Sequence, residues 1–208
     1  DACTLRAAMV SATTGVASGT CERGDLLAAD APPGTPLPTN LIRLPPAALI
    51  TLSEVHGPGI SASALALPPI LGTVVSIDGR GATIERAASL ACDLDGVAES
   101  GEFGLFEVVG FSTVVAQAST LVLADLTLRN GCADDSTSSG GGAVRVVQFA
   151  PGDRTRFDLH HVRLVGNRAR GPGGAISVSP TSAPGSAALA IRHSVLEANE
   201  SRASGGGA

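Results

Sequence analysis

The stretch that decides the fold is Gly-Gly-Gly-Ala-Val-Arg-Val-Val at residues 140–147, because it recurs at a fixed distance along the chain. It returns as Gly-Pro-Gly-Gly-Ala-Ile-Ser-Val-Ser at residues 171–179, and a third copy begins at residues 204–208. The alanines that follow the glycines are 32 and 33 residues apart: Ala143, Ala175 and Ala208. A repeat with a period of about 20–50 residues indicates a stacked-coil architecture.

The residues before the glycine clusters repeat as well. Residues 157–167 align with residues 189–199, 32 positions later, so that apolar residues fall on apolar residues. Apolar and polar residues alternate within these segments and glycines separate them, which is the pattern of short strands joined by tight turns. A lone strand of this kind cannot bury its apolar face, whereas stacked copies build a continuous core. The sequence therefore predicts an all-β parallel β-helix, or solenoid, with an antiparallel sandwich as the alternative.

One segment has the periodicity of a helix instead. In residues 3–12 the apolar side chains follow the i, i+3, i+4, i+7 spacing of a single helix face: Leu5, Ala8, Met9 and Ala12. Thr4 is a natural N-cap for this helix, and the exposed apolar end of a first coil needs a cap. We therefore expect residues 1–40 to form an N-terminal cap and residues 41–208 to form β-helix coils. The partial repeat at residues 204–208 predicts that these coils continue further.

Composition limits the class of protein. The 208 residues are 44% hydrophobic but only 2% aromatic, so the expected core consists of Val, Leu, Ile and Ala, which suits a narrow solenoid. The formal net charge is −5 and no basic patch is visible, which argues against nucleic acid and anionic membrane surfaces as partners. No apolar run of about 18 residues is present, so we expect no membrane insertion within this segment. The chain starts at Asp1, directly before its first motif, as a mature or trimmed product would.

The four cysteines are expected to form two disulfides. None belongs to a Cys-x-x-Cys pair, which argues against a zinc site. Their even number in a chain rich in Gly, Ser and Thr favours disulfides and an oxidising compartment, with free buried cysteines in a reducing cell as the alternative. Three pairings are possible. We favour Cys3–Cys21, which closes a short N-terminal loop, and Cys92–Cys132, which joins segments that neighbouring coils could bring together.

The N-terminal segment carries a resemblance to a known group of proteins. Residues 3–8, Cys-Thr-Leu-Arg-Ala-Ala, resemble the Cys-Ser-Leu-Arg-Glu-Ala motif that opens many secreted bacterial right-handed β-helix proteins. In that motif Ser and Glu, three residues apart, form a capping box. This chain has the cap hydroxyl in Thr4 but has Ala7 where the motif has Glu, so the start of its helix is expected to be weaker.

Further segments extend the resemblance over nearly the whole chain. Residues 41–53 look like the first strands of this group, and residues 76–86 resemble its Ile-Asp-Gly-x-Gly-x-x-Ile segment. Residues 123–131 resemble its Leu-Thr-Leu-x-Asn-Gly unit, and residues 167–176 are also similar to the repeats of chlamydial polymorphic outer-membrane proteins. The resemblance implies a right-handed parallel β-helix, secretion and an extracellular or cell-surface location. It implies little about activity, because this fold hosts both enzymes and passive stalks.

Two groups of acidic residues are candidates for a cation site. Asp93, Asp95 and Glu99 resemble part of a calcium loop but lack its further alternating acids, so a solvated turn is the alternative interpretation. Asp134 and Asp135 lie in a loop rich in Gly and Ser, where they hold a cation, form a catalytic pair or are plain turn residues. No cofactor besides this calcium candidate is expected.

Three histidines are candidates for a transition-metal site. His161 and His193 occupy equivalent positions of the repeat and are expected to stack on neighbouring coils, with His160 on the other face of the strand. A metal site would require the three side chains to converge with acidic ligands. No acidic residue repeats beside them, so paired strand residues on one face are the alternative interpretation. His56 falls in a Val-His-Gly-Pro-Gly loop.

Repeated glycines and asparagines predict close packing and bends. Gly142, Gly174 and Gly207 precede the repeated alanine, where we expect conformations or close approaches that tolerate no side chain. Asn167 and Asn199 are expected at bends, where an Asn side chain bonds adjacent backbone groups and, over successive coils, forms a ladder. These positions are interpreted as structural.

No catalytic residues are assigned. Lys is absent, which excludes the Arg-x-Lys element of polygalacturonases, and no acidic cluster recurs on one face as a pectate lyase would require. Two hypotheses follow. The first is a non-catalytic extracellular scaffold, adhesin-like or a matrix or fibre segment of a bacterial surface protein, whose partners are further coils of its own longer chain or copies of itself. The alternative is a polysaccharide-active β-helix enzyme similar to pectate lyases.

Overall fold

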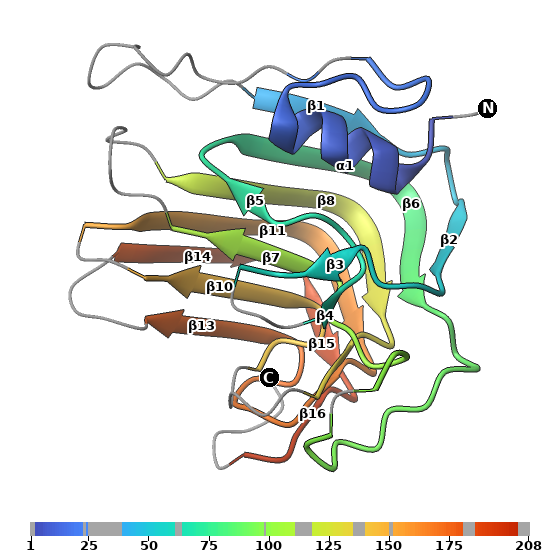
Figure 1. The fold of residues 1–208 in the computed structure, drawn as a ribbon, viewed down its shortest axis with the longest axis vertical. Coiled ribbons are helices and arrows are strands. Elements are labelled where there is room, and N and C mark those ends of the chain that lie inside the picture. The colour runs from blue at the N-terminus through green and yellow to red at the C-terminus, as the bar shows by residue number, and fades with distance from the viewer. Residues whose placement is uncertain are drawn as a thin grey trace.

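The computed structural model shows a mostly β chain in which parallel sheets stack as a solenoid of about four turns, with one short helix among the described residues (Figure 1). The structure describes residues 3–22, 24, 39–60, 64–97, 99–110, 118–134, 140–149, 152–180 and 186–203. The parallel β-helix predicted from the 32-residue period is confirmed.

The helix α1 comprises Leu5–Thr14. The strands in chain order are β1 Thr39–Arg43, β2 Leu49–Leu52, β3 Gly57–Pro58, β4 Ala64–Leu65, β5 Ile70–Leu71, β6 Val74–Arg86, β7 Phe106–Val109, β8 Ser119–Arg129, β9 Cys132–Ala133, β10 Val144–Gln148, β11 Arg154–Val165, β12 Arg168–Ala169, β13 Ile176–Pro180, β14 Ser186–Arg192, β15 Val195–Glu197 and β16 Glu200–Ser201.

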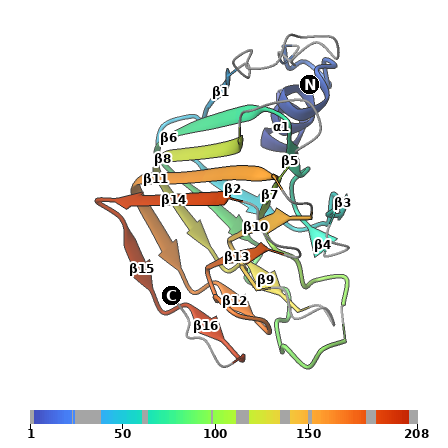
Figure 2. The ribbon, with the colours of Figure 1, turned by 90° about the vertical axis from the view of Figure 1, so that its left-hand side faces the viewer.

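Successive coils add strands to three parallel sheets (Figure 2). The largest has the order β1-β6-β8-β11-β14, with β2 beside β6 and β15 beside β11. The second has the order β13-β10-β7-β5, and the third the order β16-β12-β9. Pairs join residues one repeat apart, as Val144 pairs with Ile176. The antiparallel sandwich is therefore wrong, because the short β3–β4 pair is the one antiparallel pairing among the described strands.

Inward-facing side chains form columns that run along the solenoid axis. Val75, Leu121 and Phe157 are register partners on three successive coils, and all three are fully buried. Val108 and Val146 form a similar column in the second sheet. Each side chain therefore packs on its counterpart one coil away, which lets a narrow core of mainly aliphatic residues exclude water.

The long strands of the first sheet bend through a corner that changes which side chains point inward. The corner residues have left-handed backbone conformations with φ between 50° and 54°: Ala47, Arg80, Asp125, His161 and His193. In β11, Leu159 and Val162 are both buried, whereas the two residues between them are exposed. One left-handed residue therefore inserts an extra outward position into the two-residue alternation of a strand.

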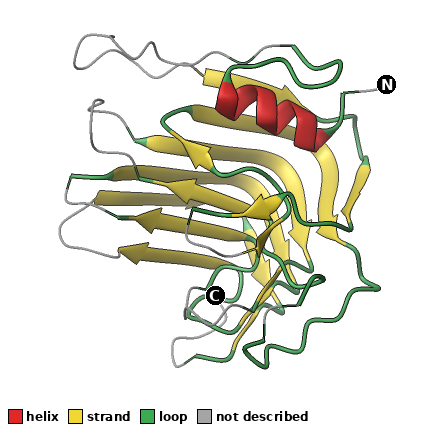
Figure 3. Ribbon diagram, in the orientation of Figure 1, coloured by secondary structure: helices red, strands yellow, loops and turns green. Residues whose placement is uncertain are grey.

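Helix α1, the one red element in Figure 3, covers the first coil (Figure 1). Thr4 is its N-cap, since Oγ1 accepts a hydrogen bond from the N–H of Ala7 at 3.2 Å, and Gly15 ends it in a left-handed conformation. The buried apolar residues of the helix belong to the main core: Leu5, Met9 and Ala12. The helix predicted at residues 3–12 begins and ends two residues later, and β1 begins at Thr39, inside the range predicted for the cap.

The cap is attached to the first coil by a long side chain and to the following loop by a disulfide. Arg6 donates from Nη2 to the carbonyl oxygen of Glu54 at 2.6 Å and from Nε to that of Ala66 at 3.2 Å. Cys3 and Cys21 form a disulfide with their Cα atoms 4.9 Å apart, which is the pairing favoured from sequence. The helix therefore has covalent and polar attachments besides its apolar face.

Two glycines of the repeat lie where no side chain fits. A Cβ atom on Gly142 would lie 2.5 Å from the carbonyl oxygen of Arg168, and one on Gly174 would lie 2.3 Å from that of Glu200. In both cases the nearest obstructing atom belongs to the backbone of the next coil, so the glycine permits two coils to approach closely. Gly207 lies outside the described residues.

We expect Gly142→Ala to lower the free energy of unfolding by about 1–3 kcal/mol, because the added methyl group forces neighbouring backbone apart. Gly57→Ala is the matched control, since a Cβ there would meet no described atom within 4 Å. Urea denaturation of both variants measures the difference. Equal unfolding midpoints would contradict this prediction, because they would mean that the added methyl group at Gly142 does not destabilise the fold.

Candidate functional site

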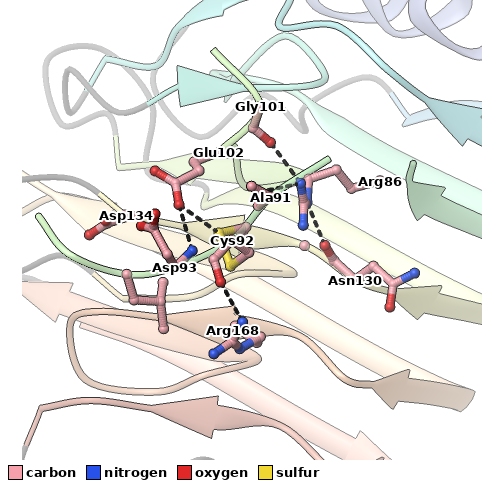
Figure 4. Close-up of a disulfide and its surroundings, with 12 residues drawn as sticks. Arg86, Ala91, Cys92, Asp93, Gly101, Glu102, Asn130, Asp134 and Arg168 are labelled. Atoms are coloured by element: carbon pink, nitrogen blue, oxygen red, sulfur yellow. Dashed lines mark hydrogen bonds between the residues drawn. A yellow bond between two sulfur atoms is a disulfide. The ribbon is translucent and has the colours of Figure 1, made fainter. Parts of the chain in front are cut away.

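Residues 91–97 form a segment, here named the crossing segment, that leaves the stack after β6 and runs past later coils (Figures 1 and 4). Its carbonyl oxygens accept hydrogen bonds from arginines of three coils: Arg86, Arg168 and Arg202. Leu94 is 1% exposed, and a disulfide joins Cys92 to Cys132 with the Cα atoms 5.9 Å apart. The crossing segment therefore connects coils along the axis, and its disulfide is the second pairing favoured from sequence.

Arg86 is an enclosed charge beside the crossing segment. Its guanidinium donates to three backbone carbonyls at 2.8–3.0 Å: those of Ala91, Gly101 and Asn130. Burial lowers the pKa of Arg86; the carboxylate of Glu102 opposes this shift, and the charge of Arg168 adds to it. Because an arginine stays protonated in proteins, Arg86 is a fixed cation that satisfies three backbone acceptors.

Glu102 lies beneath the crossing segment and is 2% exposed. Burial raises the pKa of Glu102; hydrogen bonds from the N–H groups of Asp93 and Glu99 oppose the rise, and the charges of Asp134 and Asp93 add to it. Asp93 donates to Oε1 at 3.0 Å and Glu99 donates to Oε2 at 3.3 Å. Both carboxylate oxygens are thus used to hold backbone, which is a positioning role; Figure 4 shows the bond from Asp93.

Three carboxylates gather on the crossing segment. One oxygen each of Asp93, Asp95 and Asp134 lies within 4.8 Å of the others. Asp134 is 2% exposed, and its Oδ2 accepts from the N–H of Gly96 at 2.8 Å. Its Oδ1 is buried and has no hydrogen-bond partner among the described residues. Two of the three predicted calcium ligands, Asp93 and Asp95, therefore lie close to Asp134 from the following coil.

The calcium group predicted from sequence differs from this cluster in its third member. Among the described residues the carboxylate of Glu99 does not belong to this group, and Asp134 of the following coil takes the third place. Asp135 lies outside the described residues. Calcium takes about six to eight oxygen ligands, of which the cluster would supply part. Arg168 and Arg202 bind the same segment, so their positive charges offset those of the acids.

The corner of β11 and the residue after β14 bring three histidines together. The ring centroids of His160 and His161 are 4.1 Å apart, those of His161 and His193 are 5.2 Å apart, and those of His160 and His193 are 5.7 Å apart. The prediction that His160 points to the other face is wrong, because the left-handed residue at 161 makes two consecutive side chains point outward. Nδ1 of His161 lies 3.3 Å from Oδ1 of Asp125, the corner residue of the preceding coil.

Asn167 and Asn199 form a ladder at the next bend. Asn167 is fully buried, and its Oδ1 accepts from the N–H of Gly131 at 3.0 Å. Its Nδ2 donates to the carbonyl oxygen of Leu128 at 3.2 Å and to Oδ1 of Asn199 at 3.1 Å. Asn199 repeats the pattern one coil further, accepting from the N–H of Asn167 and donating to the carbonyl of Leu164, both at 3.0 Å. The two amides therefore bind backbone groups of two successive coils, and the bond between them extends the ladder to the third coil.

Comparisons with protein-family models, with curated proteins and with solved structures find no match for this chain. The resemblance of its N-terminal motif therefore stays a sequence-based prediction. No helix in the part of the chain that the structure describes has the length and apolar character needed to cross a membrane.

Several residues of these sites received no role from the sequence. Arg168 and Glu200 form an ion pair, with Nε and Oε2 2.8 Å apart, and they are 32 residues apart in the chain. The offset that aligns the two asparagines of the ladder could therefore have found this pair. Arg86 and Asp125 carry no such signal, because insertions of unequal length separate their coils from the regular repeats.

We expect Asn167→Ala to lower the free energy of unfolding by about 1–3 kcal/mol for each buried backbone group that loses its partner. Asn199→Ala should cost less, because Asn199 is only half-buried, so water can take the place of its side chain more easily than that of Asn167. Urea denaturation of the two variants provides the comparison. A larger loss for Asn199→Ala than for Asn167→Ala would contradict this account of the ladder.

Proposed function

We propose that this chain is part of a non-catalytic extracellular β-helix scaffold, of the adhesin-like, matrix or fibre type of bacterial surface protein. The proposal rests mainly on one observation, the exposure of core columns in the last coil that the structure describes. Leu189 and Ile191 of β14 pair with Phe157 and Leu159 of β11. Phe157 and Leu159 are 0% and 1% exposed, whereas Leu189 and Ile191 are 44% and 43% exposed.

The second sheet shows the same change at this end of the stack. Val178 of β13 is 40% exposed, whereas its register partner Val146 of β10 is 2% exposed. A strand edge beside exposed apolar columns favours the addition of another strand in register. We propose that a further coil of the same kind covers this end, from a longer chain or from another copy in a fibre. Helix α1 covers the opposite end, so the stack grows in one direction.

Ion pairs between coils support a scaffold role. Glu85 pairs with Arg129, Arg163 with Glu197 at 3.0 Å, and Arg168 with Glu200 at 2.8 Å: each pair joins two neighbouring coils. Two disulfides are typical of proteins from oxidising compartments, and the resemblance of the N-terminal motif favours secretion. These features support an extracellular location.

A groove at the corner of the first sheet favours the alternative, a polysaccharide-active enzyme. Acids and bases from successive coils line this open groove: Asp78, Arg80, Asp125, His161 and Arg163. Acids on neighbouring coils are the arrangement that an enzyme acting on glycosidic bonds would need. The scaffold remains the better-supported function, because the same region lacks the aromatic platforms that sugars use; the chain has neither Trp nor Tyr.

For the scaffold we expect concentration-dependent association of the chain through its exposed columns. The double substitution Leu189→Glu and Ile191→Glu should keep the chain monomeric, because two charges would have to be buried in the contact. Val16→Glu is the control, since Val16 is 65% exposed near the cap at the other end. Sedimentation velocity over a range of concentrations measures association. Equal association of all three proteins would contradict growth from this end.

For catalysis we expect no turnover of pectin, polygalacturonate or related acidic glycans, with or without calcium. Release of reducing or unsaturated ends measures activity. Cleavage that disappears in Asp78→Ala and Asp125→Ala, or in Asp134→Ala, would establish the enzyme in place of the scaffold. Glu54→Ala, an exposed acid outside both groups, is the control variant.

A further inference from the structure

The three corner histidines are placed by the fold, not by flexible loops. His161 and His193 occupy the same corner position on neighbouring coils, with φ values of 54° and 50°. Paired parallel strands lie about 4.8 Å apart, so side chains at the same corner position lie about one strand spacing from each other. The left-handed conformation at 161 adds the side chain of His160 to the same outward face.

The geometry points to a metal site, and we propose that His160, His161 and His193 bind one divalent transition-metal ion of the zinc type. One ring nitrogen from each histidine lies within 4.8 Å of the others. Zinc binds imidazole nitrogen at about 2.0–2.1 Å, so tetrahedral ligands lie about 3.4 Å apart. All three side chains are exposed, which leaves them the freedom for the small rotations that close this gap. This role is independent of the proposed scaffold function.

Asp125 supplies the carboxylate that metal-bound histidines commonly use. Its Oδ1 lies 3.3 Å from Nδ1 of His161, which leaves Nε2 of that ring for the ion. A carboxylate at the second ring nitrogen fixes the orientation of the imidazole and makes it a more basic ligand. Asp125 reaches His161 because both are corner residues of neighbouring coils. The stacking that aligns the histidines thus also provides their positioning residue.

The donor set and the surrounding charges decide which ion fits. Three imidazole nitrogens suit Zn²⁺, Cu²⁺ or Ni²⁺, whereas calcium and magnesium prefer oxygen ligands. Three protein ligands leave a fourth position open to water. Arg163 is neutralised by Glu197 at 3.0 Å, but Arg192 is in register with His160, and its positive charge weakens the binding of a cation. We therefore expect a site of moderate affinity.

Titration of the tag-free chain with Zn²⁺ in a calorimeter tests the site. The unsubstituted chain should bind one ion, and His161→Asn and His193→Asn should each weaken binding by about 10-fold or more. Asparagine is the replacement of choice because it tolerates the left-handed conformation of both positions. Asp125→Asn should weaken binding by about 10-fold without changing the stoichiometry. His56→Asn is the control and should bind as the unsubstituted chain does.

Nuclear magnetic resonance of the unsubstituted chain gives a second readout that needs no variant. The four histidines give four imidazole Hε1 signals, and Zn²⁺ should shift those of the corner residues while leaving that of His56 in place. The proposal is overturned if Zn²⁺ shifts all four signals alike or shifts only that of His56. Undiminished binding by the His161→Asn/His193→Asn variant, or no binding at about 1 mM Zn²⁺, overturns it as well.

Discussion

Parallel pairing of each coil with the next, residue over residue, is the constraint on which the rest of the structure depends. A strand of one coil can bury its apolar face only if the same positions of the neighbouring coils are apolar too. The column of Val75, Leu121 and Phe157 meets this condition, and the column continues to Leu189, where its burial ends. The pairing that builds the core therefore also creates the exposed end from which we propose that the stack grows.

The same register brings polar side chains together without any further device. Asn167 and Asn199 are one repeat apart, so each amide binds the backbone of the preceding coil and the two side chains bind each other. His161 and His193 are one repeat apart as well, and they meet at the corner. Residues one repeat apart lie side by side on neighbouring coils. At a buried position this forms the asparagine ladder, and at an exposed position it forms the candidate metal site.

The crossing segment shows how a solenoid can be held together along its axis as well as across its sheets. Sheet hydrogen bonds join only neighbouring coils, whereas residues 91–97 bind arginines from three coils and carry a disulfide. Burial of Glu102 and Arg86 beneath this segment places opposite charges in a region with little water, where each is held by backbone groups. The charged groups of Arg86 and Glu102 bind backbone and so stabilise the fold, which agrees with the proposed scaffold role.

The sequence by itself determined the parallel β-helix and the capping helix that follows Thr4, because a 32-residue period and a helical spacing can be read along the chain. The even number of cysteines indicated disulfides, but the structure decided among the three possible pairings. Only the tertiary structure decided that the side chains of His160 and His161 point to the same face. It also decided that Asp134, and not Glu99, joins the carboxylate of Asp93. The orientation of His160 depends on the left-handed conformation of His161, which the neighbouring residues in the sequence do not indicate. The position of Asp134 beside Asp93 depends on a segment that leaves the repeat and crosses coils, so no period relates the residues that it brings together.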